Sequence, residues 1–194
     1  MSDKATQRHQ AATRAIHGTE LGEKQPGRPV VPPIVQSATF EWSKPEDGEL
    51  LYSRYGNNPN QVAVGQKIAA LEGTEAAVAL GSGMAATAMT MLALAEKGDH
   101  IVASSQLYGA TLSLLREELP RRGIETTFVD PDTADGWRDA LRPKTRLVHI
   151  ELPTNPTLRF FDPRPIVEVA RAHGIPVTCD ATFGSPVNFR PADT

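Results

Sequence analysis

The chain has 194 residues, of which 40% are hydrophobic and 22% are charged, a balance typical of a globular protein with one buried core. Its formal net charge of −3 at pH 7 gives no field that would attract nucleic acid or an anionic membrane, so we expect neither as a partner. The single cysteine, Cys179, cannot build a disulfide framework; it is expected to be a small buried side chain in a reducing compartment, and we predict a cytoplasmic protein.

The first 49 residues are rich in proline and carry little of the periodicity that builds a core. Proline fixes φ and favours extended backbone, so we expect residues 27–40 to lie extended over another surface. A proline-x-x-proline pattern inside this stretch leaves a ligand of a small recognition domain as an alternative. A short helix is predicted at residues 10–17. The sequence therefore predicts an N-terminal arm over residues 1–49 and a domain over residues 50–194.

Beyond the arm, apolar strands alternate with helical stretches. The predicted helices cover residues 62–71, 84–96, 111–121, 134–141 and 165–172. The predicted strands cover residues 76–80, 100–104, 124–129, 145–151 and 176–180. Such alternation is typical of a largely parallel sheet with helices on both faces, in which ligands bind outside the carboxyl ends of the strands.

The predicted strand at residues 76–80 breaks at Gly81-Ser82-Gly83 and leads directly into a helix. The glycines let successive backbone N–H groups turn toward one point, and the helix N-terminus adds unpaired amides and a positive dipole end, which suits a phosphate. The same letters also satisfy a dinucleotide fingerprint. That fingerprint requires a carboxylate about 20 residues later to bind a ribose. The strand there ends in Ser104 and Ser105, so the carboxylate is missing. A monophosphate is the better prediction.

Polar residues follow the other strands at the same edge of the predicted sheet. These are Tyr108, Asn155 and Asp180, which separately have structural alternatives: Asp180 as a helix cap and Asn155 as a turn former. Together with the glycine cradle they fit an aromatic heterocycle that carries a phosphate and a basic ring nitrogen. His149 alternates within an apolar strand and is expected to be a core histidine, and the five histidines show no metal-ligand spacing.

Tyr52 and Arg54 lie two residues apart in a turn-rich loop. If this loop is extended, the hydroxyl and the guanidinium point the same way, and both suit a phosphate. An ordinary surface loop with a salt-bridged arginine is the alternative.

At these residues the sequence resembles the Cys/Met-metabolism family of pyridoxal-phosphate enzymes, which includes cystathionine γ-synthase, cystathionine γ-lyase, methionine γ-lyase and the homoserine-ester sulfhydrylases. The resemblance is carried by ordered motifs, among them residues 13–17, 33–37, 52–54, 81–86, 107–109, 151–156 and 180–183. It implies pyridoxal 5′-phosphate as cofactor and the three-layer αβα sandwich of fold type I enzymes, which is aspartate aminotransferase-like. It also implies a small amino-acid substrate and a homo-oligomer, a dimer or tetramer.

The same resemblance assigns roles to single residues. It implies that the amides of Gly83 and Met84 hold the cofactor phosphate and that Tyr108 stacks on the pyridine ring near the reacting carbons. Asn155 is expected to bond the ring hydroxyl and Asp180 to pair with the protonated ring nitrogen. Tyr108 is also expected to be catalytic, and Tyr52 and Arg54 are expected to reach the phosphate in a neighbouring subunit. No metal ligand is predicted. The full predicted cofactor-binding set is Tyr52, Arg54, Ser82, Gly83, Met84, Tyr108, Asn155, Asp180 and Thr182.

The sequence departs from the family pattern in two places. Ala110 stands where methionine γ-lyases carry a cysteine, which favours cystathionine synthesis or cleavage over methionine cleavage. The family's Schiff-base lysine lies some 20 residues beyond the Asp180 motif, so the large domain is expected to be incomplete and the C-terminal small domain absent. Two hypotheses follow: an N-terminal fragment or half of a split enzyme completed by a C-terminal chain, inactive alone, or a non-catalytic remnant that binds a phosphate ligand or a homologous subunit.

Overall fold

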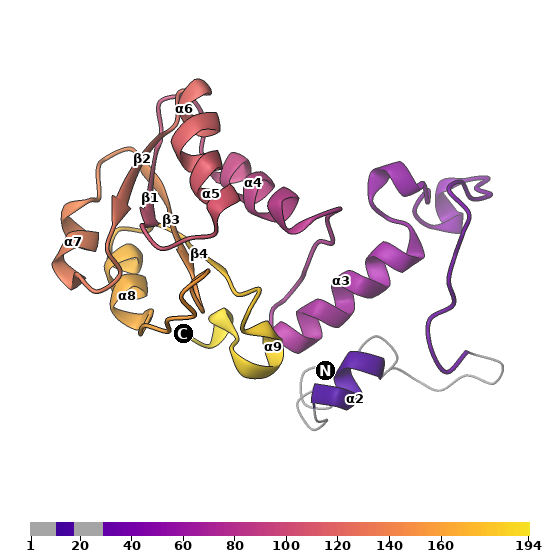
Figure 1. Cartoon of the computed structure of the whole chain (residues 1–194). Helices are drawn as coiled ribbons and strands as arrows, with labels where there is room; N and C mark the ends of the chain where they lie inside the picture. Colours follow the sequence, from indigo (N-terminus) through magenta and orange to yellow (C-terminus); the bar gives the residue numbers. More distant parts are fainter. Residues whose placement is uncertain (1–10, 18–28) are drawn as a thin grey trace. The chain divides into compact units, whose positions relative to one another are not determined.

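The computed structural model describes residues 11–17 and 29–194 and is shown in Figure 1. The chain forms two compact units, Met1–Ala79 and Leu80–Thr194. The division into an arm over residues 1–49 and a domain over residues 50–194 stays a prediction. The part of the predicted extended stretch at residues 27–28 lies outside the described residues.

The described part of the first unit contains two helices that contact each other, α2 (Ala11–His17) and α3 (Pro59–Glu72), and two short 3-10 turns, η1 (Pro45–Asp47) and η2 (Ser53–Tyr55). Helix α3 begins where the side chain of Asn58 accepts a hydrogen bond from the backbone of Asn60 at 2.9 Å, and it ends at Gly73, whose φ of 74° suits glycine. The side chain of Arg14 in α2 donates to the carbonyl of Ala70 at 3.2 Å, which ties the two helices together.

Residues 29–40 run without helix and form only one isolated antiparallel bridge, between Thr39 and Tyr52. The Asn60 side chain holds this stretch because it accepts from the N–H of Val35 at 3.0 Å and donates to the carbonyl of the same residue at 2.6 Å. The described part of the predicted extended stretch therefore lies without regular helix, as expected, and is fixed by side-chain hydrogen bonds.

The second unit is built on a four-stranded sheet in which every neighbouring pair is parallel (Figure 1). Its strands are β1 (His100–Ser104), β2 (Glu125–Val129), β3 (Thr145–Glu151) and β4 (Val177–Asp180), in the order β2-β1-β3-β4. Its helices are α4 (Gly83–Leu94), α5 (Gly109–Ser113), the π-helical turn η3 (Leu114–Glu118), α6 (Leu119–Arg121), α7 (Ala134–Asp139), α8 (Arg164–Ala172), α9 (Ser185–Asn188) and the 3-10 turn η4 (Pro191–Asp193). Within the described second unit, the parallel α/β prediction is confirmed.

Two apolar cores lie on the two faces of this sheet. On one face Ile101 and Leu147 pack with Met91 of α4 and Leu115 of the α5–α6 segment, all almost fully buried. On the other face Val102 and Val148 pack with Trp137 of α7 and with Ile166 and Ala170 of α8. Successive strand residues point to opposite faces, so each buried strand serves both cores, and each fully buried aliphatic side chain stabilises the fold by about 1.5–3 kcal/mol. The three layers follow directly from this pattern.

The predicted strand at residues 76–80 is wrong. Residues 75–80 have no strand pairing, and Val78 and Leu80 are 83% and 46% exposed. A strand forms only where a neighbouring strand pairs its N–H and C=O groups, and no such neighbour lies within the described residues. The predicted helix at residues 111–121 is present but begins at Gly109 and contains the π-helical turn η3. Among the described residues, no helix is long and apolar enough to cross a membrane.

Candidate functional site

The glycine turn that precedes α4 forms an open helix N-terminus. Ser82 is the N-cap residue, and its hydroxyl accepts a hydrogen bond from the N–H of Ala85 at 3.1 Å. A Cβ added to Gly81 or Gly83 would meet no atom within 4 Å, so both glycines border open space. The N–H groups of the first helical turn have no carbonyl partner within the helix, and the positive end of the dipole lies there. The start of α4 can therefore bind an anion.

A cavity of about 380 Å³ opens at this helix start and at the carboxyl ends of β3 and β4. It is lined by Ser82, Gly83, Met84, Thr87, Tyr108, Glu151, Pro153, Asn155, Asp180, Thr182 and Phe183. Every predicted site residue of the second unit is in this set. The volume lies in the range of pockets that hold a small organic ligand.

Asp180 ends β4 at the cavity wall, where its orientation is fixed by Thr182. One carboxylate oxygen, Oδ1, accepts from the backbone N–H of Thr182 at 3.0 Å and from its hydroxyl at 2.6 Å. Within the described residues no donor bonds the other oxygen, Oδ2. This is a turn held by side-chain hydrogen bonds and not a helix cap, so the structural alternative for Asp180 is wrong. The arrangement leaves one oxygen for a ligand.

Tyr108 lines the same cavity with a side chain that is 46% exposed. It precedes α5, and its backbone N–H donates to the Oε2 atom of Glu151 at 2.7 Å. Asn155 lies half-buried in the loop after β3. An exposed ring, an amide and a carboxylate thus face one volume beside the anion-binding helix start.

Glu151 is a site residue that the sequence analysis did not select. Its side chain lines the cavity, yet the residue is only 4% exposed. Burial raises the pKa of the Glu151 carboxyl above its ordinary value, and hydrogen bonds from the backbone of Tyr108 and Asn155 oppose this rise, while the nearby charge of Asp180 adds to it. The sequence did contain a signal for Glu151, namely its position. A carboxylate at the end of a buried strand lies at the edge of the sheet where ligands bind.

His149 lies in the core below this edge, as expected for a core histidine. It is 4% exposed, and its Nδ1 atom lies 2.9 Å from the hydroxyl of Thr178. Its Nε2 atom is buried and has no hydrogen-bond partner in the described part of the chain. Burial lowers the pKa of His149 to about 4, so its ring is neutral near pH 7. Residues 11–17 and 29–194 contain no group of three or more side chains placed to hold a metal ion.

Tyr52 and Arg54 belong to the first unit. The loop is not extended at this point, because Ser53–Tyr55 forms the 3-10 turn η2, so the expectation that both side chains point the same way by strand geometry does not apply. The Tyr52 ring is half-buried and meets Tyr55 edge to face at 5.2 Å. Arg54 is exposed, and in the described ranges no ion pair involves it. The salt-bridged alternative for Arg54 therefore has no support.

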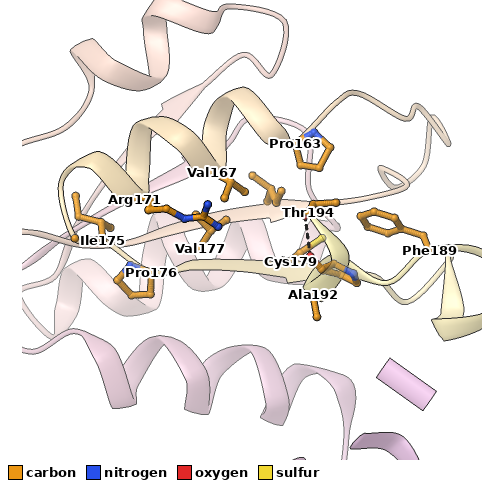
Figure 2. Close-up of a pocket in the computed structure, with 13 residues that line it drawn as sticks. Pro163, Val167, Arg171, Ile175, Pro176, Val177, Cys179, Phe189, Ala192 and Thr194 are labelled. Atoms are coloured by element: carbon orange, nitrogen blue, oxygen red, sulfur yellow. Dashed lines mark hydrogen bonds between the residues drawn. The ribbon is translucent and has the colours of Figure 1, made fainter. Parts of the chain in front are cut away.

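A second cavity of about 550 Å³ lies between α8, β4 and the C-terminal residues. Figure 2 shows Val167 and Arg171 of α8 beside Val177 of β4, with Phe189 farther along the cavity. Cys179 is half-buried here and packs against the core on this face, so the expectation of a buried cysteine is met only in part, because β4 is an edge strand of the sheet. None of the predicted site residues lines this cavity, and Arg171 is its one charged lining residue. The cavity at Ser82 and Asp180 is therefore the candidate site.

A parallel α/β sheet with an anion-binding helix start, an exposed aromatic ring and a carboxylate at its ligand edge defines a protein that binds an aromatic phosphate. Comparison with known proteins agrees with this class. The chain belongs to the family of Cys/Met metabolism PLP-dependent enzymes, whose profile matches residues 12–194.

Relatives and solved structures of this family match nearly the whole chain. A canavanine γ-lyase of Pseudomonas canavaninivorans is 42% identical over 93% of this chain and 46% of its own length, and an L-methionine γ-lyase of Porphyromonas gingivalis is 38% identical over 94% and 47%. The crystal structure of metB from Corynebacterium glutamicum superposes with a TM-score of 0.88 at 31% identity, covering 97% of this chain and 49% of that one.

A putative O-acetylhomoserine (thiol)-lyase of Campylobacter jejuni, described with N′-pyridoxyl-lysine-5′-monophosphate, superposes with a TM-score of 0.87 at 27% identity and covers 95% of this chain and 47% of that one. The chain thus spans about half the length of the relatives that it matches. The predictions of the family, of fold type I and of pyridoxal phosphate as its cofactor are confirmed.

Proposed function

We propose that this chain carries the N-terminal part of the pyridoxal-phosphate site of an enzyme that eliminates or replaces the γ-substituent of cysteine- or homoserine-derived amino acids. The observation that carries the proposal is the one cavity that joins the open start of α4 to Tyr108, Asn155 and Asp180. The names of the relatives support the reaction class, since they include γ-lyases and a probable cystathionine γ-synthase.

The residues of the cavity fit the cofactor by their chemistry. The amides of Gly83 and Met84 would hold the phosphate, since the start of α4 is open and carries no acidic side chain in its first turn. The half-exposed Tyr108 would cover the ring, and Asn155 would bond its hydroxyl. The Oδ2 atom of Asp180 would accept from the ring nitrogen, with Oδ1 held by Thr182. When bound, the cofactor supplies an electron-withdrawing ring that stabilises negative charge on the substrate.

Tyr52 and Arg54 are proposed to reach the phosphate site of a neighbouring subunit, because an exposed arginine without an ion pair is suited to phosphate. The substrate is proposed to be an amino acid with a sulfur or oxygen atom at the γ-position. The canavanine γ-lyase relative favours an oxygen-linked leaving group as a second candidate beside the sulfur amino acids. Ala110 favours cystathionine over methionine among the sulfur substrates.

The proposal is tested by titrating the 194-residue chain with pyridoxal phosphate and, separately, with pyridoxal, and following the absorbance of the ring. We expect the phosphate form to bind roughly tenfold more tightly, because only the phosphate gains the amides at the start of α4. Equal affinities for the two compounds would contradict the assignment of the start of α4 as the phosphate site. A chain that binds the phosphate form but never supports turnover in any assembly would fit the alternative, a non-catalytic remnant.

No lysine of the described residues lines the cavity. Lys44, Lys67, Lys97 and Lys144 are the described lysines, and none is among the residues that line the site. Covalent capture of the cofactor needs an amine near its aldehyde, so we propose that this chain binds it noncovalently and is inactive alone. Borohydride reduction of the chain with pyridoxal phosphate, followed by peptide mass mapping, should give no stoichiometric pyridoxyl group on a lysine. A saturable label on one lysine would show that the chain anchors the cofactor itself.

A further inference from the structure

Glu151 is the buried carboxylate of the site and lies beside the exposed Tyr108 and the half-buried Asp180. It ends β3, and its partner in the strand register is Asp180 at the end of β4. Only 4% of Glu151 is exposed, whereas 46% of Tyr108 is exposed. A buried carboxylate is costly unless hydrogen bonds compensate for lost hydration, so the contacts of Glu151 identify what its charge stabilises.

The compensation comes from the backbone amide of a neighbouring loop. The Oε2 atom of Glu151 accepts from the N–H of Tyr108 at 2.7 Å. Tyr108 stands where the loop after β1 enters α5, and Asn155 stands in the loop after β3. The Glu151 side chain therefore ties the end of β3, from which the Asn155 loop leads, to the loop that presents the ring of Tyr108 to the cavity.

No cation shares this carboxylate. In the part of the chain that the structure describes, no ion pair involves Glu151, and the charge that acts on its pKa is the like charge of Asp180, which raises it. Hydrogen bonds to an ionised acceptor are about twice as strong as neutral ones. The strength of the contact between Glu151 and the Tyr108 amide therefore depends on the ionisation of Glu151.

We propose that Glu151 is a positioning residue: it acts through the backbone of Tyr108 to fix the aromatic ring, relative to the strand end that leads to Asn155, at the spacing that the bound cofactor requires. The proposal rests on the proposed function, since it takes pyridoxal phosphate as the ligand of this cavity. Glu151 itself touches neither the ring nor the phosphate in this role.

Two substitutions separate the contributions of the carboxylate. Glu151→Gln keeps an acceptor oxygen for the Tyr108 amide but removes the charge. Glu151→Ala removes the acceptor and leaves the Tyr108 N–H without it. Glu168→Gln on α8 is the matched control, because Glu168 is exposed and is not among the residues that line the cavity.

The first test uses the chain alone and needs no variant. An amide proton that donates to a carboxylate shifts when the carboxylate ionises, so the N–H signal of Tyr108 should move in an NMR pH titration with a midpoint above 4.5, the ordinary pKa of glutamate. Glu151→Gln should remove this titration, whereas Glu168→Gln should keep it. A Tyr108 amide that does not titrate, or that titrates equally in the Glu151→Gln variant, would overturn the proposal.

The second test measures pyridoxal phosphate affinity, with thermal unfolding recorded for every variant. Glu151→Gln should raise Kd roughly tenfold and Glu151→Ala further, whereas Glu168→Gln should stay within about twofold of the parent. Unchanged Kd in a folded Glu151→Gln variant would overturn the proposal. If Glu151→Ala does not fold, the Gln variant and the amide titration decide. A parent chain that does not bind the cofactor defeats the proposed function, while the amide titration still reports on the contacts of Glu151.

Discussion

Asp180→Asn is expected to lower γ-elimination turnover roughly 100-fold or more in an assembly that contains a complete site. A fixed carboxylate keeps the ring nitrogen of the cofactor protonated, and a neutral amide cannot, so the ring withdraws electrons less strongly. A suitable assembly joins residues 1–194 to the C-terminal half of the canavanine γ-lyase relative, assayed with canavanine and with L-methionine. The fold should persist, because an amide oxygen at position 180 can still accept both hydrogen bonds from Thr182.

Asp162→Asn is the matched control for this substitution. Asp162 pairs with the exposed Arg164 at 2.7 Å and lines neither cavity, so its loss should leave turnover within about twofold. The unsubstituted fusion must be active for the comparison to count. Turnover of the Asp180→Asn fusion close to that of the Asp162→Asn fusion would contradict the role assigned to Asp180.

Acidification from pH 6.5 to pH 4 is expected to cost the chain about 3 kcal/mol of stability through His149 alone. The ordinary pKa of histidine is 6.5, and burial lowers that of His149 to about 4, so between these values the unfolded state binds a proton that the native state does not. The stability is therefore complete above pH 6.5 and falls as the pH drops. Urea unfolding at a series of pH values between 7 and 4 measures it.

His149→Gln should remove this pH-dependent loss, since glutamine does not titrate in this range. The exposed His173, whose Nδ1 atom lies 2.9 Å from the carbonyl of Val169, gives the matched control His173→Gln, which should keep the loss. Glu151 acts in the opposite sense, because its raised pKa favours the native state on acidification, but it is present in all three proteins and cancels in the comparison. An equal loss in the His149→Gln protein would show that His149 is not the group responsible.

The parallel sheet was predictable because its strands are short, apolar and separated by helices with clear ends. Strands such as His100–Ser104 and Thr145–Glu151 were predicted with the bounds that the structure shows. The segment at residues 76–80 has the same apolar composition but no strand to pair with among residues 11–17 and 29–194, and composition alone does not reveal whether a partner strand is present.

The site was predictable where its chemistry is local. The glycine turn before α4 and the polar residues after each strand can be located from the sequence, since the carboxyl ends of parallel strands meet at one edge. The role of Glu151 could not be predicted in this way, because it depends on a contact with Tyr108, which is 43 residues away in sequence. The loop at Ser53–Tyr55 was predicted to be rich in turns, but its 3-10 form was not, because its side chains alone do not distinguish a 3-10 turn from an extended loop.

The unpaired segment at residues 76–80 also affects how the chain behaves at high concentration. Its sequence, Ala-Ala-Val-Ala-Leu, is apolar and uncharged, and Val78 is 83% exposed. Backbone groups without strand partners beside exposed apolar side chains are a template for intermolecular β-pairing. Self-association of the chain should therefore begin at this segment, and a charged residue placed at Val78 is the simplest way to keep concentrated samples monodisperse.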